Sequence, residues 1–183
     1  SDSNYPKGTD WWYVDTRYCI IECSFSPWAY PVVLIPKNTG GITFYVDYRK
    51  TNNVSQTDAY PLPTIHEILE SLSGAVVFTT LDLNSGYWQV EMDQESKDKT
   101  AFVCAEGLFS FKVMPFGLKN APATFQRLME IALGELKGKI CFVYLDDIII
   151  YSQNRERHFQ DLQAVLDKLR EAGLTLNMKK SNF

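Results

Sequence analysis

Two adjacent aspartates between two short apolar runs constrain the fold of this 183-residue chain more than any other feature. The runs Ile140–Leu145 and Ile148–Tyr151 have the length and the β-branched or aromatic content of strands, and they flank Asp146 and Asp147. The pattern predicts a β-hairpin with two carboxylates at its tip. Ionised carboxylates held together beside a core repel one another unless a cation neutralises them, so the pair indicates a metal site. The alternative is a solvated turn, where Asp is common.

The rest of the chain alternates strand and helix patterns. β-Branched segments with a period of two predict strands, and apolar residues spaced by three and four predict helices. The predicted strands are Val32–Ile35, Ile42–Tyr48, Val76–Leu83, Tyr87–Met92, Thr100–Ala105 and Leu108–Met114, and the predicted helices are Thr64–Gly74, Asn120–Leu136 and Arg157–Ala172. This mixture predicts an α+β fold with an antiparallel sheet backed by helices on one face. Residues 1–19 are left unassigned, because most of them follow no period.

Composition and charge exclude several classes of protein. Eighteen Lys and Arg against 22 Asp and Glu give a net charge of -4, so the overall charge does not indicate a nucleic-acid binder or an anionic membrane surface as partner. No apolar run approaches the roughly 20 residues that cross a bilayer. The chain begins without Met or an apolar leader, and its four cysteines lack the spacing of a metal or redox motif. We therefore expect an intracellular protein, not a secreted one, that is part of something longer.

A third carboxylate belongs to the same prediction. Asp82 lies at the end of the predicted strand Val76–Leu83. If this strand pairs with the Asp-Asp hairpin, Asp82 and Asp146 converge at one edge of the sheet. Carboxylate oxygens suit Mg²⁺, and three of these groups can hold the two ions of an in-line phosphoryl transfer.

The motifs around these aspartates resemble those of reverse transcriptases from gypsy-class LTR retrotransposons. Tyr144-Leu145-Asp146-Asp147 is similar to the Tyr-x-Asp-Asp box of that family, and other motifs follow in the family's order. These are Val46-Asp47-Tyr48-Arg49, Tyr60-Pro61-Leu62-Pro63, Leu81-Asp82-Leu83-Asn84-Ser85-Gly86-Tyr87, Lys99-Thr100-Ala101-Phe102, Met114-Pro115-Phe116-Gly117-Leu118 and Asn120-Ala121-Pro122-Ala123-Thr124-Phe125-Gln126-Arg127-Leu128-Met129. The resemblance covers about residues 20–183 and implies reverse transcriptase activity.

The resemblance also implies the right-hand polymerase fold, present here as a palm with a partial fingers subdomain. The fingers would span about residues 20–75 and 100–120, and the palm about residues 76–99 and 121–183. The chain would be truncated before the primer grip. A thumb, a connection and an RNase H domain are therefore not expected in it.

Roles for single residues follow from matching positions in the family's motifs. The resemblance makes Asp82, Asp146 and Asp147 the catalytic carboxylates that bind two Mg²⁺ ions, for which Mn²⁺ can substitute. It assigns nucleotide binding to Lys37, Leu83, Tyr87, Phe116 and Gly117, and template-primer contacts to Arg49, Gln126, Arg127 and Tyr144. Tyr87 would lie under the incoming sugar, where its ring excludes a 2′-hydroxyl. The structural alternatives are a turn for Asp147, core packing for Tyr87 and Phe116, a salt bridge to Asp47 for Arg49, and plain solvent exposure for Gln126 and Arg127.

The implied reaction is RNA-directed DNA synthesis, in which a primer 3′-hydroxyl attacks the α-phosphate of a deoxynucleotide. One metal ion would lower the pKa of the hydroxyl and the other would stabilise the leaving pyrophosphate. The implied partners are an RNA or DNA template with its primer, deoxynucleoside triphosphates, and the rest of a Pol polyprotein with RNase H and integrase, but no membrane. The expected location is the cytoplasm or the particles of the element.

One departure from the family supports a second hypothesis. Thr43 occupies the position at which family members usually have an arginine that binds the triphosphate. Together with the truncation, it favours a catalytically silent retroelement remnant that binds nucleic acid or a partner without turnover. An aspartic protease or RNase H from the same polyprotein is disfavoured, because the chain has no Asp-Thr/Ser-Gly box.

Overall fold

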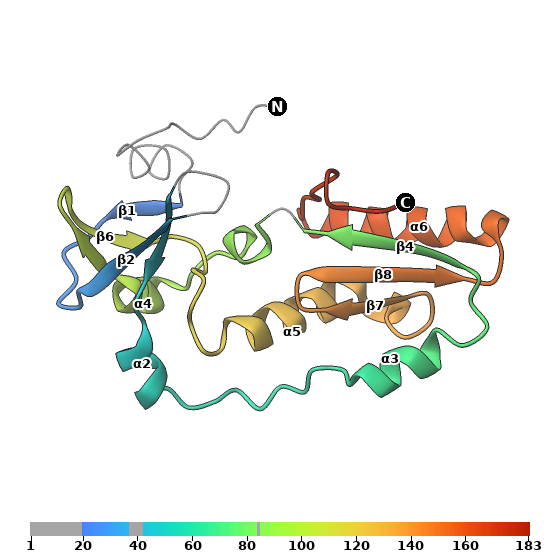
Figure 1. Ribbon diagram of the computed structural model, residues 1–183, viewed down its shortest axis with the longest axis horizontal. Helices are drawn as coiled ribbons and strands as arrows, with labels where there is room; N and C mark the ends of the chain where they lie inside the picture. The colour runs from blue at the N-terminus through green and yellow to red at the C-terminus, as the bar shows by residue number, and fades with distance from the viewer. Residues whose placement is uncertain (1–19, 37–41, 84) are drawn as a thin grey trace. The chain divides into compact units, whose positions relative to one another are not determined.

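The computed structural model describes residues 20–36, 42–83 and 85–183, which form two compact units (Figure 1). Unit 1 consists of the chain up to Thr57 together with Tyr87–Ala121, and unit 2 consists of Asp58–Gly86 and Pro122–Phe183. This division differs from the expected fingers and palm boundaries in two places. Residues 58–75 group with unit 2, and residues 87–99 group with unit 1.

Unit 1 is built on a mixed sheet. Among its described residues, five strands take the order β1-β6-β5-β2-β3, and every pair is antiparallel except β2 with β5. The strands are β1 (Ile21–Cys23), β2 (Tyr30–Pro36), β3 (Ile42–Val46), β5 (Phe102–Cys104) and β6 (Gly107–Phe111). The short helices are α2 (Arg49–Val54), η1 (Gly86–Gln89), α4 (Gln94–Lys97) and η2 (Asp98–Thr100).

Aromatic side chains form the core of unit 1. Phe102 is fully buried, and its ring lies 5.3 Å from that of Phe111 and 6.0 Å from that of Phe109, measured between ring centroids. Tyr48 is buried beside them, and its hydroxyl donates to the carbonyl of Thr100 at 2.8 Å. The two predicted hairpins, β2 with β3 and β5 with β6, are therefore confirmed and share one core.

Unit 2 carries an antiparallel sheet in the order β4-β8-β7. Its strands are β4 (Val77–Asp82), β7 (Cys141–Tyr144) and β8 (Asp147–Ser152), and its helices are α3 (Ile65–Ser71), α5 (Ala121–Leu133), η3 (Gly134–Leu136) and α6 (Arg155–Glu171). The paired residues Leu81, Ile148 and Val143 are buried. The next row of paired residues is Asp82, Asp147 and Tyr144, so these side chains point to the opposite face of the sheet.

Helices α3 and α5 begin where the sequence predicts, whereas α6 begins at Arg155, before the predicted start at Arg157. Thr64 caps α3 in a capping box with Glu67, and the Asn154 side chain caps α6 by accepting from the Arg157 N–H at 2.8 Å. Helix α6 lies along β4 and β8 (Figure 1). Ile68 of α3 packs against residues on the other face, Phe142 and Tyr151.

The predicted strand Tyr87–Met92 is wrong in its first half, although Glu91 forms an antiparallel bridge with Val113. Residues Gly86–Gln89 instead form the 3₁₀ helix η1, with the Val90 N–H donating to the Tyr87 carbonyl at 3.1 Å. The backbone already turns before this point, because Ser85 has a φ of 50°. The large residues here, Tyr87 and Trp88, pack against Phe116 within unit 1. Residues Tyr87–Gln89 form no hydrogen-bonded ladder with a neighbouring strand. Strand β1 and helices α2 and α4 were not predicted.

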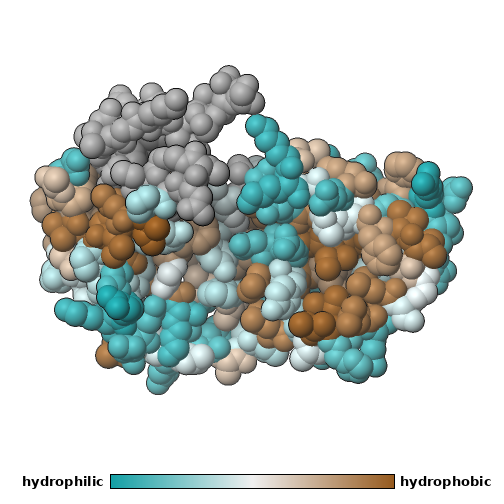
Figure 2. All heavy atoms as spheres, viewed as in Figure 1, coloured by the Kyte–Doolittle hydropathy of each residue, from teal (hydrophilic) through white to brown (hydrophobic). Residues whose placement is uncertain are grey.

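No helix in the described ranges is both long and apolar enough to cross a membrane. Some apolar side chains remain at the surface of each unit, including Leu34 in unit 1 and Ile131 in unit 2. Figure 2 shows such hydrophobic areas interrupted by polar ones. Ile131 is a single exposed residue of the ordinary kind, whereas Leu34 lies between two other exposed apolar residues of β2, Val33 and Ile35.

Candidate active site

The turn between β7 and β8 determines where the predicted carboxylates lie. Tyr144 pairs with Asp147, so only Leu145 and Asp146 form the loop of the hairpin. Leu145 adopts a left-handed conformation, with a φ of 55°, and Asp146 has no positive φ, the combination that a two-residue loop of type II′ requires. A side chain with a Cβ rarely adopts this conformation, which costs on the order of 1–3 kcal/mol. The surrounding residues must therefore stabilise it.

Asp82 lies next to this turn on the neighbouring strand. It is the register partner of Asp147, and the N–H of the following residue, Leu83, donates to the Asp146 carbonyl at 3.3 Å. The C-terminal segment fixes the other side of Asp82, whose carbonyl accepts from the Asn177 N–H at 2.8 Å. The Lys180 Nζ lies 3.8 Å from the Asp82 Oδ2. The predicted convergence of β4 with the Asp-Asp hairpin at one end of the sheet is confirmed.

Asp146 is the carboxylate with the least compensated environment. Its Oδ1 is buried and has no hydrogen-bond partner among the described residues. Burial raises the pKa of its carboxyl, the negative charges of Asp147 and Asp82 raise that pKa further, and Lys180 opposes the shift. A carboxylate in such a place attracts a cation, because a positive charge would relieve both the desolvation and the repulsion.

Gly86 leaves room beside that carboxylate. A Cβ added to Gly86 would lie 2.9 Å from the Cζ of Phe125 and 3.4 Å from the Oδ1 of Asp146. Phe125 is fully buried, so its ring has little freedom to move away. Position 86 is therefore restricted to glycine by close approach, and the Asn-Ser-Gly motif is the sequence signal for it.

The ligand chemistry of the turn fits a divalent cation, although the ligands are not preassembled. Asp82, Asp146 and Asp147 offer only carboxylate oxygens, the donors that Mg²⁺ and Mn²⁺ prefer. In the described part of the chain, however, no three acidic, histidine or cysteine side chains are already gathered around one point. Mutual repulsion of like charges accounts for this spacing. The fold thus brings the three residues to one end of one sheet. Binding of an ion would draw their carboxylate oxygens together.

The predicted nucleotide-binding residues divide between the two units. In unit 1, the rings of Tyr87 and Phe116 lie 5.1 Å apart, and Trp88, which the sequence analysis did not single out, lies 5.8 Å from Phe116. Gly117 has a φ of 93°, and its carbonyl accepts from the Asn52 side chain at 2.8 Å. These contacts order the Phe116-Gly117 loop.

Two other nucleotide-binding predictions are limited by the structure. The side chain of Leu83 is buried in unit 2, so only its backbone could contact a ligand. Lys37 lies outside the described residues. The prediction for the Leu83 side chain is therefore not supported, and the one for Lys37 stays a prediction.

The predicted template-primer residues are placed differently from one another. Arg49 forms a two-pronged ion pair with Asp47, with its NH2 nitrogen 2.6 Å from the Asp47 Oδ2, as the structural alternative proposed. Tyr144 is partly exposed beside the carboxylates. Arg127 has a partly exposed side chain and binds Asp58.

The prediction of a template contact for Gln126 is wrong. Its side chain is fully buried and forms hydrogen bonds with the backbone of Val143 and Leu145 and with Glu130. The helical spacing places it beside the apolar stripe of α5, and a buried amide with three protein partners has no capacity for a strand at the surface. Gln126 is part of the support of the carboxylate turn.

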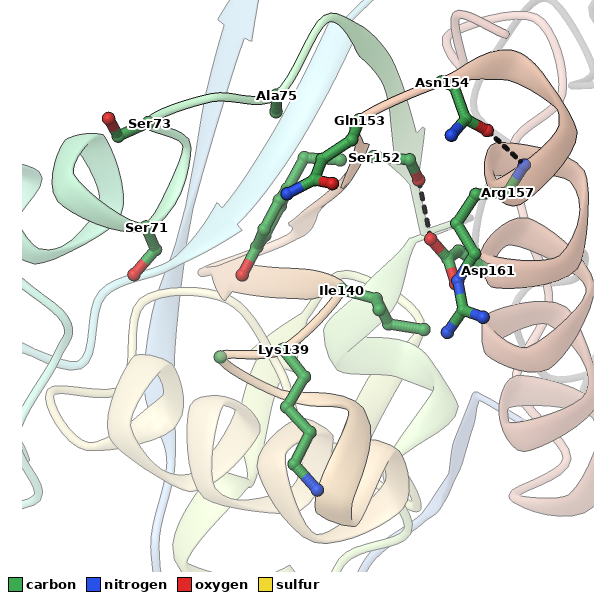
Figure 3. Close-up of a pocket in the computed structure, with 12 residues that line it drawn as sticks. Ser71, Ser73, Ala75, Lys139, Ile140, Ser152, Gln153, Asn154, Arg157 and Asp161 are labelled. Carbon is green, nitrogen blue, oxygen red and sulfur yellow. Dashed lines mark hydrogen bonds and ion pairs between the residues drawn. The ribbon is translucent and has the colours of Figure 1, made fainter.

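A cavity of about 530 Å³ lies at the opposite end of β8 (Figure 3). Its lining includes Lys139, Ser152, Arg157 and Asp161. The polar groups inside it bind one another, since the Ser152 hydroxyl donates to the Asp161 Oδ2 at 2.7 Å and the Arg157 Nε lies 3.0 Å from the Asp161 Oδ1. The cavity therefore lacks the uncompensated charge found at the carboxylate turn, and we regard the turn as the candidate active site.

The sequence is similar to those of known proteins from one family. The profile described as "Reverse transcriptase (RNA-dependent DNA polymerase)" matches residues 35–183. The retrovirus-related Pol polyprotein from transposon opus of Drosophila melanogaster is 44% identical over 169 residues, which are 90% of this chain and 17% of that polyprotein. The Tf2-3 polyprotein of Schizosaccharomyces pombe is 38% identical over 155 residues, which are 85% of this chain and 12% of that polyprotein. The chain thus spans only a small part of the length of these relatives.

Solved structures share the fold. The native crystal structure of the prototype foamy virus protease-reverse transcriptase has a TM-score of 0.84 and 27% sequence identity, and the match covers 98% of this chain and 25% of the viral one. The foamy viral enzyme in complex with dsDNA has a TM-score of 0.79 and 26% identity over 98% of this chain and 39% of the viral one. The predicted α+β palm and fingers fold is confirmed. The chain belongs to the reverse transcriptase (RNA-dependent DNA polymerase) family, and its relatives are Pol polyproteins of LTR retrotransposons.

Proposed function

We propose that this chain contributes the catalytic carboxylates for RNA-directed DNA synthesis, in which Asp82, Asp146 and Asp147 bind divalent metal ions. The observation that carries the proposal is the buried Oδ1 of Asp146, which has no hydrogen-bond partner in the described ranges and is repelled by two neighbouring carboxylates. Family membership supports it, because nucleotidyl transfer by this family depends on divalent metals. We propose Mg²⁺ as the ion, with Mn²⁺ as a substitute.

Each carboxylate has a distinct part in this proposal. Asp82 on β4 and Asp147 on β8 are register partners, and Asp146 lies in the adjoining turn. An ion could therefore receive ligands from both strands and from the turn. Metal ions, when bound, polarise phosphoryl oxygens and lower the pKa of a hydroxyl nucleophile. Lys180 lies near enough to Asp82 to balance part of the negative charge before an ion binds.

The proposed substrates are deoxynucleoside triphosphates and a primer on an RNA or DNA template. The foamy viral enzymes that share the fold were solved with an RNA/DNA hybrid and with dsDNA, which supports this class of partner. Half-buried Tyr87 and exposed Phe116 form an aromatic pair that could contact a nucleotide, with Tyr87 as the group that excludes a 2′-hydroxyl. Location in the cytoplasm or in element particles belongs to the same proposal.

Single-nucleotide primer extension tests the proposal. A labelled DNA primer on an RNA template is incubated with an excess of the chain, Mg²⁺ and deoxynucleotides, so that weak binding does not hide the chemistry. We expect extension by the parent and a loss of at least about 100-fold in Asp146→Asn, since loss of even an outer-shell partner of a metal ligand typically costs 10–100-fold. Asp167→Asn, an exposed carboxylate on α6, is the matched control and should extend the primer like the parent.

A folded parent that extends no better than Asp146→Asn would contradict the proposal. The silent-remnant hypothesis would then replace it, and Thr43 would be the first position to examine. Folding of each variant is checked by circular dichroism before the assay.

A further inference from the structure

Gln126 forms hydrogen bonds with the backbone that leads into the strained residue of the carboxylate turn. The Leu145 N–H donates to the Gln126 Oε1 at 3.2 Å, and the Gln126 Nε2 donates to the Val143 carbonyl at 3.0 Å. Val143 is the last fully buried residue of β7, and Leu145 is the residue with a φ of 55°. One buried amide therefore connects the end of the strand to the left-handed residue that follows it.

Glu130 determines which way this amide points. The second hydrogen of the Gln126 Nε2 donates to the Glu130 Oε1 at 2.9 Å. If the amide were turned by 180°, its oxygen would face the Val143 carbonyl and the Glu130 carboxylate, two acceptors, and its nitrogen would face the donor at Leu145. The two acceptors and the single donor thus select one orientation of the amide.

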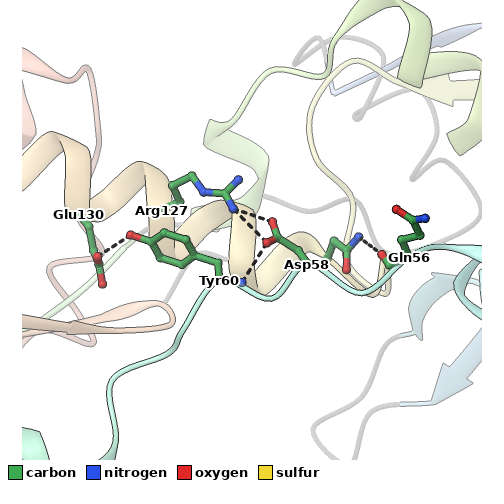
Figure 4. Close-up of polar contacts among 6 residues, drawn as sticks. Gln56, Asp58, Tyr60, Arg127 and Glu130 are labelled. Carbon is green, nitrogen blue, oxygen red and sulfur yellow. Dashed lines mark hydrogen bonds and ion pairs between the residues drawn. The ribbon is translucent and has the colours of Figure 1, made fainter.

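Two further side chains hold Glu130, and Figure 4 shows one of them, Tyr60. The Tyr60 hydroxyl donates to the Glu130 Oε2 at 2.6 Å, and the Lys137 Nζ lies 2.5 Å from the same oxygen. Although burial would raise the pKa of the Glu130 carboxyl, the bonds from Lys137, Tyr60 and Gln126 lower it, so Glu130 acts as an ionised acceptor. Arg127 supports Tyr60, since its guanidinium carbon lies 4.7 Å from the centroid of that ring.

We propose that Gln126 is a positioning residue, oriented by Glu130, that holds Leu145 in its left-handed conformation and thereby presents Asp146 to a metal ion. The inference rests on the proposed function for its consequence at the metal. Its structural part, control of the turn, does not depend on that function. It also gives Tyr60 a role at the carboxylates, although Tyr60 belongs to the Tyr60-Pro61-Leu62-Pro63 segment and lies far from them in sequence.

Amide hydrogen exchange tests the structural part. Gln126→Met keeps the side-chain volume but removes all three hydrogen bonds. We expect the Leu145 amide to exchange at least about 10-fold faster than in the parent, and the amide of Ile150 in the middle of β8 to change by less than about 3-fold. Equal acceleration at both amides would mean general loosening of the fold and would overturn the inference, as would unchanged exchange at Leu145.

The chain offers a closely matched control for this variant. The Gln163 Nε2 donates to the Asp167 Oδ1 at 2.9 Å, the same spacing of four residues and the same distance as between Gln126 and Glu130, but on the exposed surface of α6. Gln163→Met should leave the exchange of Leu145 unchanged. If Gln126→Met does not fold, Glu130→Gln serves in its place, because it removes the charge that orients the amide while keeping an acceptor, and we expect it to accelerate exchange at Leu145 by about 3-fold.

Binding of Mn²⁺, followed by electron paramagnetic resonance of the free ion, tests the consequence. We expect Gln126→Met to weaken Mn²⁺ binding about 10-fold. Leu145→Gly should reduce this dependence, because glycine adopts a positive φ without strain. In the Leu145→Gly background the same Gln126→Met substitution should therefore weaken binding by only about 3-fold.

The outcomes separate the two proposals. If the parent binds no Mn²⁺, the proposed function fails, while the exchange experiment still decides the role of Gln126. If the parent binds Mn²⁺ and Gln126→Met binds it equally well, the positioning inference fails and the proposed function stands. An equal loss with Leu145 and with Gly at position 145 would also overturn the inference, since the left-handed residue would then not transmit the effect.

Discussion

The two ends of the sheet in unit 2 carry polar clusters of opposite character. At one end, Asp82, Asp146 and Asp147 repel one another, and one buried oxygen has no hydrogen-bond partner in the described part of the chain. At the other end, His158 and Asp161 of α6 are buried and fully engaged with strand residues. The two clusters lie at opposite ends of the same sheet, but the ionisable groups of the second one belong to α6, so the sheet alone does not account for their difference.

The second cluster forms a closed set of hydrogen bonds. The Ser152 hydroxyl gives its one hydrogen to the Asp161 Oδ2, so the His158 Nδ1, 2.9 Å from that hydroxyl oxygen, must be the donor to it. The other ring nitrogen of His158, Nε2, forms a hydrogen bond with the Thr79 hydroxyl at 2.8 Å. Arg157 balances the charge of Asp161. Every group has a partner from the protein, which is the pattern of a structural network, whereas the carboxylate turn has the pattern of a site that needs a ligand.

The largest effect on stability is expected at the closed network. Asp161→Ala leaves the Ser152 hydroxyl and the His158 ring without their anion, and it removes the partner of Arg157. We expect the free energy of unfolding to fall by about 3 kcal/mol, at the lower end of the range for a buried pair because Arg157 remains mostly in water. Urea unfolding measures this change. A loss below about 1 kcal/mol would show that the network is not an important part of the fold.

Metal ions should distinguish the two ends. At a Mg²⁺ or Mn²⁺ concentration of 100 times the dissociation constant, preferential binding to the folded chain should stabilise the parent by about 2.7 kcal/mol. Asp146→Ala should lose this increment. Asp161→Asn should begin from a lower melting temperature but gain the same increment as the parent. If Asp146→Ala keeps the metal-dependent stabilisation, or if Asp161→Asn loses it, the ion does not bind at the carboxylate turn.

Much of the fold could be predicted because its signals are local. The β5–β6 hairpin, the apolar stripe of α5 and the Thr64 cap are each specified within about ten residues of sequence, and all three are confirmed. The loop of that hairpin is Ala105-Glu106, one residue before the predicted Glu106-Gly107, because Gly107 pairs with Cys104. The strand predicted at Tyr87–Met92 failed because alternation does not distinguish a strand from a 3₁₀ turn whose rings pack against a distant loop, here the one containing Phe116.

The candidate site shows the same limit. Asp146 and Asp147 stand out in sequence as charges between strands, and Asp82 stands out at a strand end. The environment of Gln126 depends on contacts with Val143, Leu145 and Glu130, and periodicity on one helix cannot report them. The nearness of Lys180 to Asp82 likewise depends on how the last residues fold back along β4.

Removing charge should have opposite effects at the two ends when no metal is present. Asp146→Asn removes one of three like charges and supplies an amide hydrogen, so we expect it to stabilise the chain by about 0.5 kcal/mol, the scale of like-charge repulsion between neighbouring strands. The matched substitution Asp161→Asn should destabilise it. Both are measured by urea unfolding in the presence of a chelator. Destabilisation by Asp146→Asn would mean that its carboxylate is satisfied by the protein, and the contrast between the two ends would disappear.

The smallest effect concerns a third arrangement, a carboxylate satisfied by the protein at its surface. Hydrogen bonds from the Arg49 side chain, and then from its backbone N–H, lower the pKa of Asp47 from 3.8 to about 2. A lowered pKa in the folded state stabilises the fold above pH 3.8, and this contribution is lost as the pH falls from 3.8 through about 2. In Arg49→Ala we expect the Asp47 carboxyl to titrate near its ordinary value, as followed by its carbon chemical shift in NMR, and that part of the acid dependence to disappear. Arg155→Ala, at the start of α6, is the control and should leave the titration of Asp47 unchanged.

Mg²⁺ should not shift the titration of Asp47 in the parent, because Arg49 already supplies the cation for this carboxylate. A shift as large as that caused by Arg49→Ala would show that a protein partner does not protect a carboxylate from metal. The distinction between the two ends of the sheet in unit 2 would then lose its basis.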